Sequence, residues 1–123
     1  MKQSEINGIK FYYRDGTSDL KTFEEVIRKD VYRKKGMTIQ RGEHWIDCGG
    51  NVGAFTLLAC SLGAKVTTYE PDPNNCQMIK KNLELKDFEK DDLPVPVITE
   101  NEIVSGLINF QSLLIIFKEK TIK

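Results

Sequence analysis

One nine-residue stretch, residues 45–53 (Trp-Ile-Asp-Cys-Gly-Gly-Asn-Val-Gly), constrains the fold more than any other part of the chain. It has the pattern of a short buried strand that ends on Asp47 and is followed by a glycine-rich turn. Apolar residues then recur at helical spacing as far as Leu62, before Gly63, so a helix is predicted after the turn. Asn51 is expected to cap this helix through its side-chain oxygen. A strand that enters a helix through glycines is expected to leave backbone N–H groups open to a polar ligand.

The spacing of the glycines limits the class of ligand. A dinucleotide-binding fingerprint requires G-x-G-x-x-G, but counting from Gly49 places Asn51 and Ala54 at its second and third glycine positions. A phosphate-binding P-loop requires a terminal Gly-Lys-Ser/Thr, which this stretch lacks. The pattern is instead Asp-x-Gly-x-Asn-x-Gly, and Glu70 ends the next strand-like segment, residues 64–70. In a βαβ unit such an acid lies beside the glycine turn, where it can accept hydrogen bonds from both ribose hydroxyls.

Two motifs, residues 47–53 (D-C-G-G-N-V-G) and residues 70–74 (E-P-D-P-N), carry a resemblance to a known family. Together they resemble the nucleotide-binding core of class I S-adenosylmethionine-dependent methyltransferases, and within that class the FkbM group. The close similarity runs from residue 45 to about residue 83, and a looser one from about residue 14 to residue 110.

This resemblance implies an α/β fold with a Rossmann-like sheet and S-adenosylmethionine as the cofactor. It implies cofactor-binding roles for seven residues of the two motifs: Asp47, Gly49, Gly50, Asn51, Gly53, Glu70 and Asp72. In the family, residues just after the third strand approach the adenine ring, which here implies Glu102 and Ile103. The resemblance identifies no catalytic residue in this sequence, and no metal site is expected.

The chain is expected to have two parts. Residues 1–43 are predicted to form a strand at residues 9–13 and a cover helix that ends near residue 35. Residues 44–123 are predicted to form a partial Rossmann-like, S-adenosylmethionine-binding domain, with its third strand at residues 95–99.

Two helix starts carry capping signals. In the N-terminal part, Thr22 and Glu25 stand at capping-box spacing, with residues 18–19 as an earlier alternative. After Glu70, Asp72 is predicted to be the N-cap of a helix and Pro73 its first residue.

The sheet is expected to be incomplete. Class I methyltransferases have about seven strands, of which this chain supplies the first three. Residues 113–117 are the only candidate for a fourth, but the connection from Glu100 is too short for the usual parallel crossover. They are therefore predicted to form a hairpin-like extension, and the strand at residues 45–47 is predicted to keep one open edge. Because an open edge pairs readily with other chains, this truncated chain is expected to self-associate.

Composition and charge exclude several classes of function. The 123 residues suffice for one small domain, and 18 basic and 18 acidic residues give no net charge. The electrostatic footprint of a nucleic-acid-binding protein is thus missing. The longest aliphatic run, residues 113–117, is too short to span a bilayer, and the N-terminus lacks the apolar segment of a signal peptide. A cytoplasmic location is therefore expected.

The cysteines and the single histidine indicate structural roles. Cys48, Cys60 and Cys76 follow neither a disulfide framework nor a metal-ligand spacing, so three reduced thiols are expected. His44 lies at the beginning of the predicted strand, whereas ligands bind at the carboxyl ends of parallel strands. A structural role for His44 is therefore preferred over that of a catalytic base.

Three functions remain open. The first is a methyltransferase of the FkbM type that O-methylates a sugar or another small hydroxylated acceptor. The second is a non-catalytic module that holds the cofactor or pairs with another chain. The third is an NAD- or FAD-binding Rossmann protein, which Asn51 in place of the second glycine disfavours.

Overall fold

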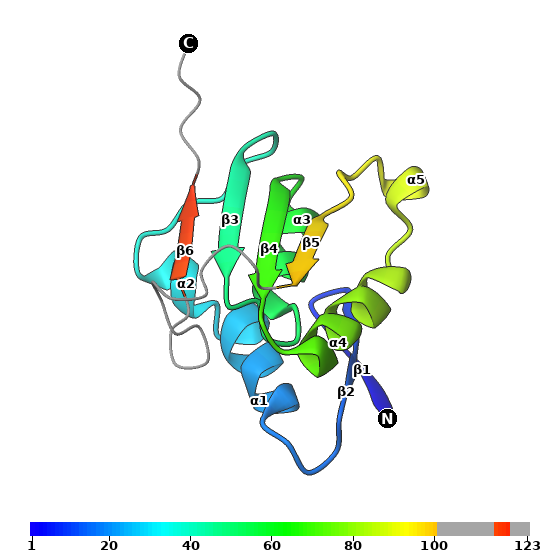
Figure 1. The fold of residues 1–123 in the computed structure, drawn as a ribbon. Helices are drawn as coiled ribbons and strands as arrows, with labels where there is room; N and C mark the ends of the chain where they lie inside the picture. The colour runs from blue at the N-terminus through cyan, green and yellow to red at the C-terminus, as the bar shows by residue number, and fades with distance from the viewer. Residues whose placement is uncertain (101–114, 119–123) are drawn as a thin grey trace.

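The structure, a computed structural model, describes residues 1–100 and 115–118 (Figure 1). Its elements, in chain order, are β1 (Lys2–Ile6), β2 (Ile9–Tyr13), α1 (Asp19–Phe23), the π-helix η1 (Glu24–Arg28), α2 (Val31–Lys34), β3 (His44–Cys48), α3 (Ala54–Ser61), β4 (Lys65–Glu70), α4 (Pro73–Glu84), α5 (Phe88–Asp91), β5 (Val97–Glu100) and β6 (Ile115–Lys118).

The described strands form a two-stranded sheet, β1-β2, and a four-stranded sheet in the order β5-β4-β3-β6. In the larger sheet, β3, β4 and β5 are parallel. Their spatial order is that of the first three strands of a doubly wound fold. The predicted α/β class with a Rossmann-like parallel sheet is therefore confirmed.

Strand β6 corrects the prediction of an open edge on β3. It pairs antiparallel with β3, with Cys48 opposite Ile115 and Trp45 opposite Lys118. An antiparallel strand needs no crossover helix, so a short segment is enough to occupy the position beside β3. Residues 101–114 lie outside the described residues. The hairpin-like extension therefore stays a prediction.

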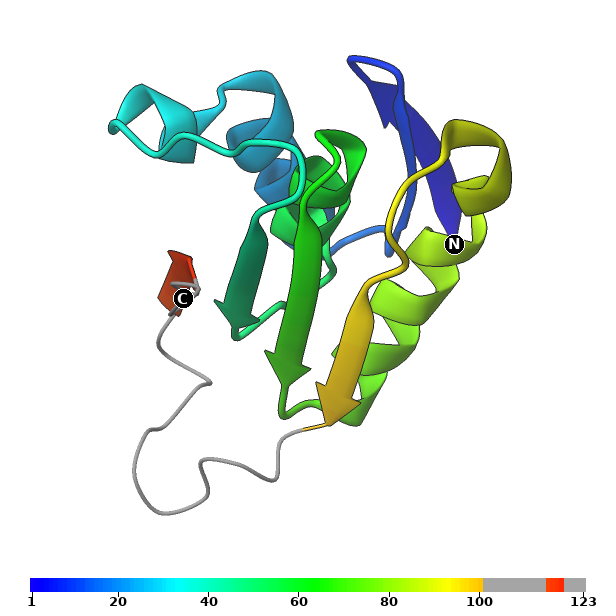
Figure 2. The ribbon, with the colours of Figure 1, turned by 90° about the horizontal axis from the view of Figure 1, so that it is seen from above.

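The described helices lie on one face of the larger sheet (Figure 2). Connections from one parallel strand to the next are right-handed, so α3 and α4, which both step in the same direction along the sheet, fall on the same face. Strand β2 contacts both of these helices from their outer side. The β1-β2 hairpin, α3 and α4, and the sheet thus form successive layers.

Helix α3 is the centre of these layers. Its residues Ala54 to Cys60 are all buried, because the sheet lies on one side of it and the N-terminal elements on the other. Trp45 of β3 packs against Phe55 with ring centroids 5.9 Å apart. On the outer side, Phe11 of β2 stacks on Phe23 of α1, with ring centroids 4.0 Å apart. The apolar spacing after the glycine turn thus marks the main core helix.

The N-terminal part departs from the sequence prediction in two ways. Strand β1 was not expected; the missed signal is Asn7-Gly8, both at positive φ, which is a frequent two-residue hairpin turn. The prediction of a single cover helix is also wrong. The helical segment ends with η1 at Arg28, and Asp30 adopts a left-handed conformation before the separate helix α2. The change of direction lets Tyr32 pack edge-on against Phe55.

Of the predicted caps of the first helix, the alternative is at the right position: Ser18 is the N-cap of α1, although its side chain makes no capping hydrogen bond. The Thr22–Glu25 capping box is wrong, because Thr22 lies inside α1 and its hydroxyl donates to the Ser18 carbonyl, 3.0 Å away. At α4 the prediction is confirmed: the Asp72 side chain accepts from the Asn74 N–H at 2.8 Å, and Pro73 is the first helical residue.

An ion pair fixes the loop between β2 and α1. The Arg14 guanidinium donates to both carboxylate oxygens of Asp19, through Nε at 2.8 Å and Nη2 at 3.0 Å, and the Arg14 backbone N–H donates at 2.9 Å. Asp19 is buried. Burial alone would raise the pKa of Asp19, but the hydrogen bonds from Arg14 outweigh it and hold this pKa below its usual value.

Replacing Asp19 by Asn is expected to lower the free energy of unfolding by about 1–3 kcal/mol, because charge-assisted hydrogen bonds to a buried carboxylate are lost. Urea denaturation measures the change. The matched control is Asp15→Asn, which breaks an exposed ion pair with Lys2 and is expected to change stability little. Equal stability of the two variants would contradict a structural role for the Arg14–Asp19 pair.

Candidate functional site

The glycine turn connects the end of β3 to the start of α3 and is held against the end of β4. The N–H groups of Gly49 and Gly50 both donate to the Tyr69 carbonyl, at 2.7 and 3.1 Å. The Gly53 N–H donates to the Gly50 carbonyl at 2.9 Å. The expectation that the turn offers these groups to a ligand is therefore wrong, because the fold itself uses them.

The glycines of the turn are required by conformation and by packing. Gly49 and Gly53 have φ of 80° and 93°, a region that side chains disfavour. At Gly50 the limit is space, since a Cβ there would lie 2.2 Å from the Thr68 Cγ2. At Gly53 a Cβ would lie 3.3 Å from the Ile79 Cγ1. The turn is thus packed directly onto β4 and α4.

Asn51 does not cap α3, which corrects the sequence prediction. The N-cap is Gly53, with no side-chain hydrogen bond. Asn51 instead has a φ of 53°, in the left-handed region that asparagine adopts more readily than most residues. Its conformation directs its backbone N–H to the Glu70 Oε1, 2.7 Å away.

Glu70 joins the two sequence motifs. It ends β4, and its side chain is buried, with 5% exposed. One carboxylate oxygen accepts the Asn51 N–H and the other accepts the Asp72 N–H at 2.8 Å. Since each carboxylate oxygen has two lone pairs, both retain acceptor capacity for a further donor. The structure thus places Glu70 beside the glycine turn, as the sequence predicted.

Asp47 lies beneath the same turn and is fully buried. Its Oδ2 accepts from the Thr56 hydroxyl at 3.1 Å, and Thr56 also contacts the Thr68 hydroxyl at 2.7 Å. Among the described residues, the Asp47 Oδ1 has no hydrogen-bond partner. Burial raises the pKa of Asp47 to about 7, against the hydrogen bond from Thr56 and with a contribution from the negative charge of Glu70.

The positions of Asp47, Glu70 and the turn's N–H groups indicate which class of ligand the site favours. Two carboxyl groups, Asp47 and Glu70, lie at the carboxyl ends of adjacent parallel strands. The turn's N–H groups at residues 49, 50, 51 and 53 are already bonded within the protein. The two carboxyl groups favour a ligand that offers hydroxyl donors or carries positive charge.

Other candidate residues fall outside this arrangement. Glu102 and Ile103 lie outside the described residues. His44 contacts the Thr67 hydroxyl at 2.7 Å through its Nε2 and begins β3, in agreement with a structural role. Cys48, Cys60 and Cys76 are free thiols. Within the described part of the chain, no group of side chains has the composition of a metal site, and no helix is long and apolar enough to cross a membrane.

Replacing Gly50 by Ala is expected to lower the free energy of unfolding by about 1–3 kcal/mol, because the new methyl group meets Thr68 in a packed interior. Thermal melting measures the loss. The double variant Gly50→Ala, Thr68→Ser removes the obstructing methyl group and keeps the hydroxyl, so it is expected to regain part of the loss. A double variant less stable than the sum of the two single effects would contradict the packing argument.

Asp47 is expected to make stability depend on pH. Its pKa in the fold, about 7, is above the ordinary 3.8, so the folded state holds the proton more tightly. Its contribution is therefore complete below pH 3.8 and is lost as pH rises through 7.

The isosteric variant Asp47→Asn should remove this loss. At about pH 8 the variant is expected to gain on the order of 1–4 kcal/mol relative to wild type, since one pKa unit corresponds to about 1.4 kcal/mol. Urea denaturation of both proteins across this pH range measures the difference. Parallel pH profiles of the two proteins would show that Asp47 does not titrate near neutrality.

Comparisons with known proteins agree with the architecture. No protein-family model matches the sequence, and the search of curated proteins gives no match. Among solved structures, the chain is similar to the C-terminal domain of precorrin-6Y C5,15-methyltransferase from Rhodobacter capsulatus, with a TM-score of 0.54 and 18% sequence identity. The match covers 79% of this chain and 47% of that chain, so this chain spans about half the length of its structural neighbour. This likeness supports a Rossmann-like α/β fold.

Proposed function

We propose that this chain binds S-adenosylmethionine and forms the cofactor-binding part of a methyltransferase. The observation that carries the proposal is Glu70, whose carboxylate links the glycine turn to the start of α4 at the carboxyl end of β4. Both of its oxygens retain lone pairs directed to no other protein group that the structure describes. These are suited to the two ribose hydroxyls of the cofactor.

The charge of the site supports the same ligand. The sulfonium of S-adenosylmethionine is positively charged, and the Glu70 carboxylate lies beside the turn. NAD or FAD is disfavoured by Asn51, which stands in place of the second glycine of the dinucleotide-binding fingerprint.

Methyl transfer asks little covalent chemistry of the protein. The cofactor supplies an activated methyl group when it is bound, and the protein's part is to align it with the acceptor. In this chain the alignment falls to the rigid turn and to Glu70. No described residue is assigned the role of general base.

Within this proposal, the finer assignment is to the FkbM type, acting on a hydroxyl of a sugar or another small acceptor. It is supported by D-x-G-x-N-x-G and E-P-x-P-x-N at their observed separation. A second candidate function is a non-catalytic cofactor-binding module, because the contacts of Glu70 and of the turn concern cofactor binding alone. Incubation with methyl-labelled S-adenosylmethionine and a panel of sugar alcohols separates the two, since only the methyltransferase releases S-adenosylhomocysteine.

The variant Glu70→Gln is expected to weaken S-adenosylhomocysteine binding by roughly tenfold to a hundredfold. The variant loses charge-assisted bonds to the ribose worth about 1.5–3 kcal/mol. Isothermal titration calorimetry measures the affinity, with NAD as the competing ligand class.

Glu84→Gln is the matched control, because Glu84 is exposed at the other end of α4 and is expected to leave the affinity unchanged. Circular dichroism verifies that both variants are folded. Unchanged affinity in a folded Glu70→Gln variant would refute the proposal that Glu70 binds the ribose hydroxyls. Tighter binding of NAD than of S-adenosylhomocysteine would refute S-adenosylmethionine as the cofactor.

A further inference from the structure

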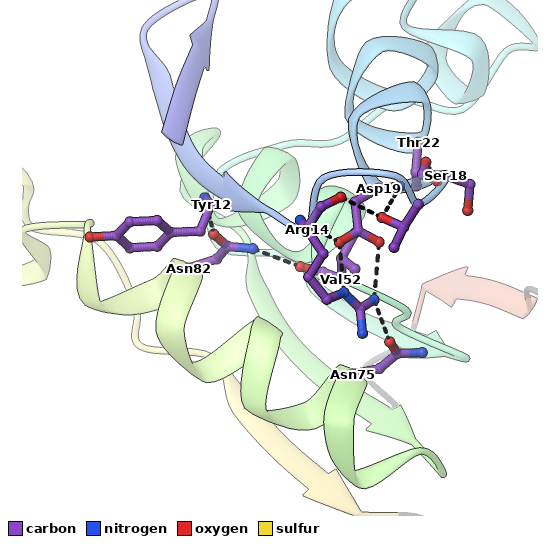
Figure 3. Close-up of polar contacts among 9 residues, drawn as sticks. Tyr12, Arg14, Ser18, Asp19, Thr22, Val52, Asn75 and Asn82 are labelled. Atoms are coloured by element: carbon purple, nitrogen blue, oxygen red, sulfur yellow. Dashed lines mark hydrogen bonds and ion pairs between the residues drawn. The ribbon is translucent and has the colours of Figure 1, made fainter. Parts of the chain in front are cut away.

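Two asparagines of α4 attach the N-terminal segment to the candidate site (Figure 3). Asn75 and Asn82 are two helical turns apart, so they lie on the same face of the helix. Asn75 Oδ1 accepts from the Arg14 Nη2 at 2.9 Å. Asn82 accepts the backbone N–H of Tyr12 through its Oδ1. Both asparagines therefore bind the end of β2 or the loop that follows it.

Asn82 also contacts the glycine turn. Its Nδ2 donates to the Val52 carbonyl at 3.0 Å, and both residues are fully buried. Val52 lies between Asn51, whose N–H binds Glu70, and Gly53, the N-cap of α3. One side-chain amide thus bridges a backbone donor of β2 and a backbone acceptor of the turn, as Figure 3 shows.

We propose that Asn82 is a positioning residue, which sets the glycine turn for the cofactor by tying it to strand β2. The inference rests on the proposed function, because the turn is taken as the cofactor site. Asn82 does not touch the proposed ligand and acts through Val52. The hydrogen bond from Arg14 to Asn75 holds the end of β2 at a second point, and the ion pair with Asp19 fixes the Arg14 side chain there.

The chemistry of position 82 separates this role from simple packing. The site needs one acceptor, toward Tyr12, and one donor, toward Val52, on a planar group of fixed size. An ionised aspartate has the same shape but only acceptors, so it keeps the bond to Tyr12 and loses the one to the turn, whereas the protonated form that burial favours can still donate to the Val52 carbonyl. The variant Asn82→Asp therefore releases the turn in its ionised form, and Asn82→Leu, a side chain of similar size without donors or acceptors, removes the bond to the turn at any pH.

The test uses the full 123-residue chain and two measurements. In Asn82→Leu and in the ionised Asn82→Asp variant, the affinity for S-adenosylhomocysteine is expected to fall about tenfold, as for the loss of one buried hydrogen bond. Amide hydrogen exchange by NMR is expected to quicken about tenfold at Asn51 and Gly53, whose N–H groups are bonded within the site, while the strand amides of β4 keep their rates.

The control is Ile6→Ala, a buried residue of the same hairpin that makes no hydrogen bond to the turn. It is expected to lower stability and to leave both the affinity of the folded protein and the relative exchange rates unchanged. A folded Asn82→Leu variant with wild-type exchange at Asn51 and Gly53 would overturn the positioning role.

The two proposals fail separately. Absence of S-adenosylhomocysteine binding by the wild-type protein refutes the proposed function, and hydrogen exchange still decides the positioning role. If Asn82→Leu does not fold, native-state exchange of the wild-type protein decides it. Tyr12, Asn51 and Gly53 are then expected to open together, with the same dependence on urea. Opening of Tyr12 at lower urea than the other two would refute the coupling.

Discussion

The Glu70 carboxylate is the interaction on which the site depends. Its two oxygens take the backbone N–H groups of Asn51 and Asp72, which belong to segments that follow different strands. A buried carboxylate without such donors is strongly destabilising, so the conformations of both segments are linked to one side chain. This explains how a turn with few side chains of its own keeps a defined shape.

The N-terminal elements are part of this arrangement rather than a separate cover. Strand β2 contacts α3 and α4, and Phe11 and Phe23 extend the apolar core outward from α3. Polar groups are placed where this layer meets the ends of the parallel strands: Arg14 and Asp19 at the loop, and Asn82 between β2 and the turn. Apolar packing holds the layers together, and these few hydrogen bonds fix the position of the N-terminal layer relative to the glycine turn.

The sequence predicted the features that local patterns encode. The β3–turn–α3 unit, Glu70 at the end of β4, and the Asp72-Pro73 helix start follow from spacing and capping chemistry. The left-handed Asp30 depends on tertiary packing. The aliphatic run at residues 113–117 signals a strand, but its antiparallel pairing with β3 is a tertiary contact that no local pattern marks. In the sequence, Asn82 cannot be distinguished from the other polar residues of a helix surface. Its hydrogen-bond partners, Tyr12 and Val52, lie 70 and 30 residues away along the chain.

The separation between Tyr12 and Asn82 also bears on the order in which the protein folds. The β1-β2 hairpin closes through local contacts and is synthesised first, whereas α4 leaves the ribosome much later. Closing a long loop costs chain entropy before its contacts form, so docking of the hairpin belongs to a late step of folding. The glycine turn then reaches its final geometry only after the β1-β2 hairpin has docked on α4, since Asn82 links the two.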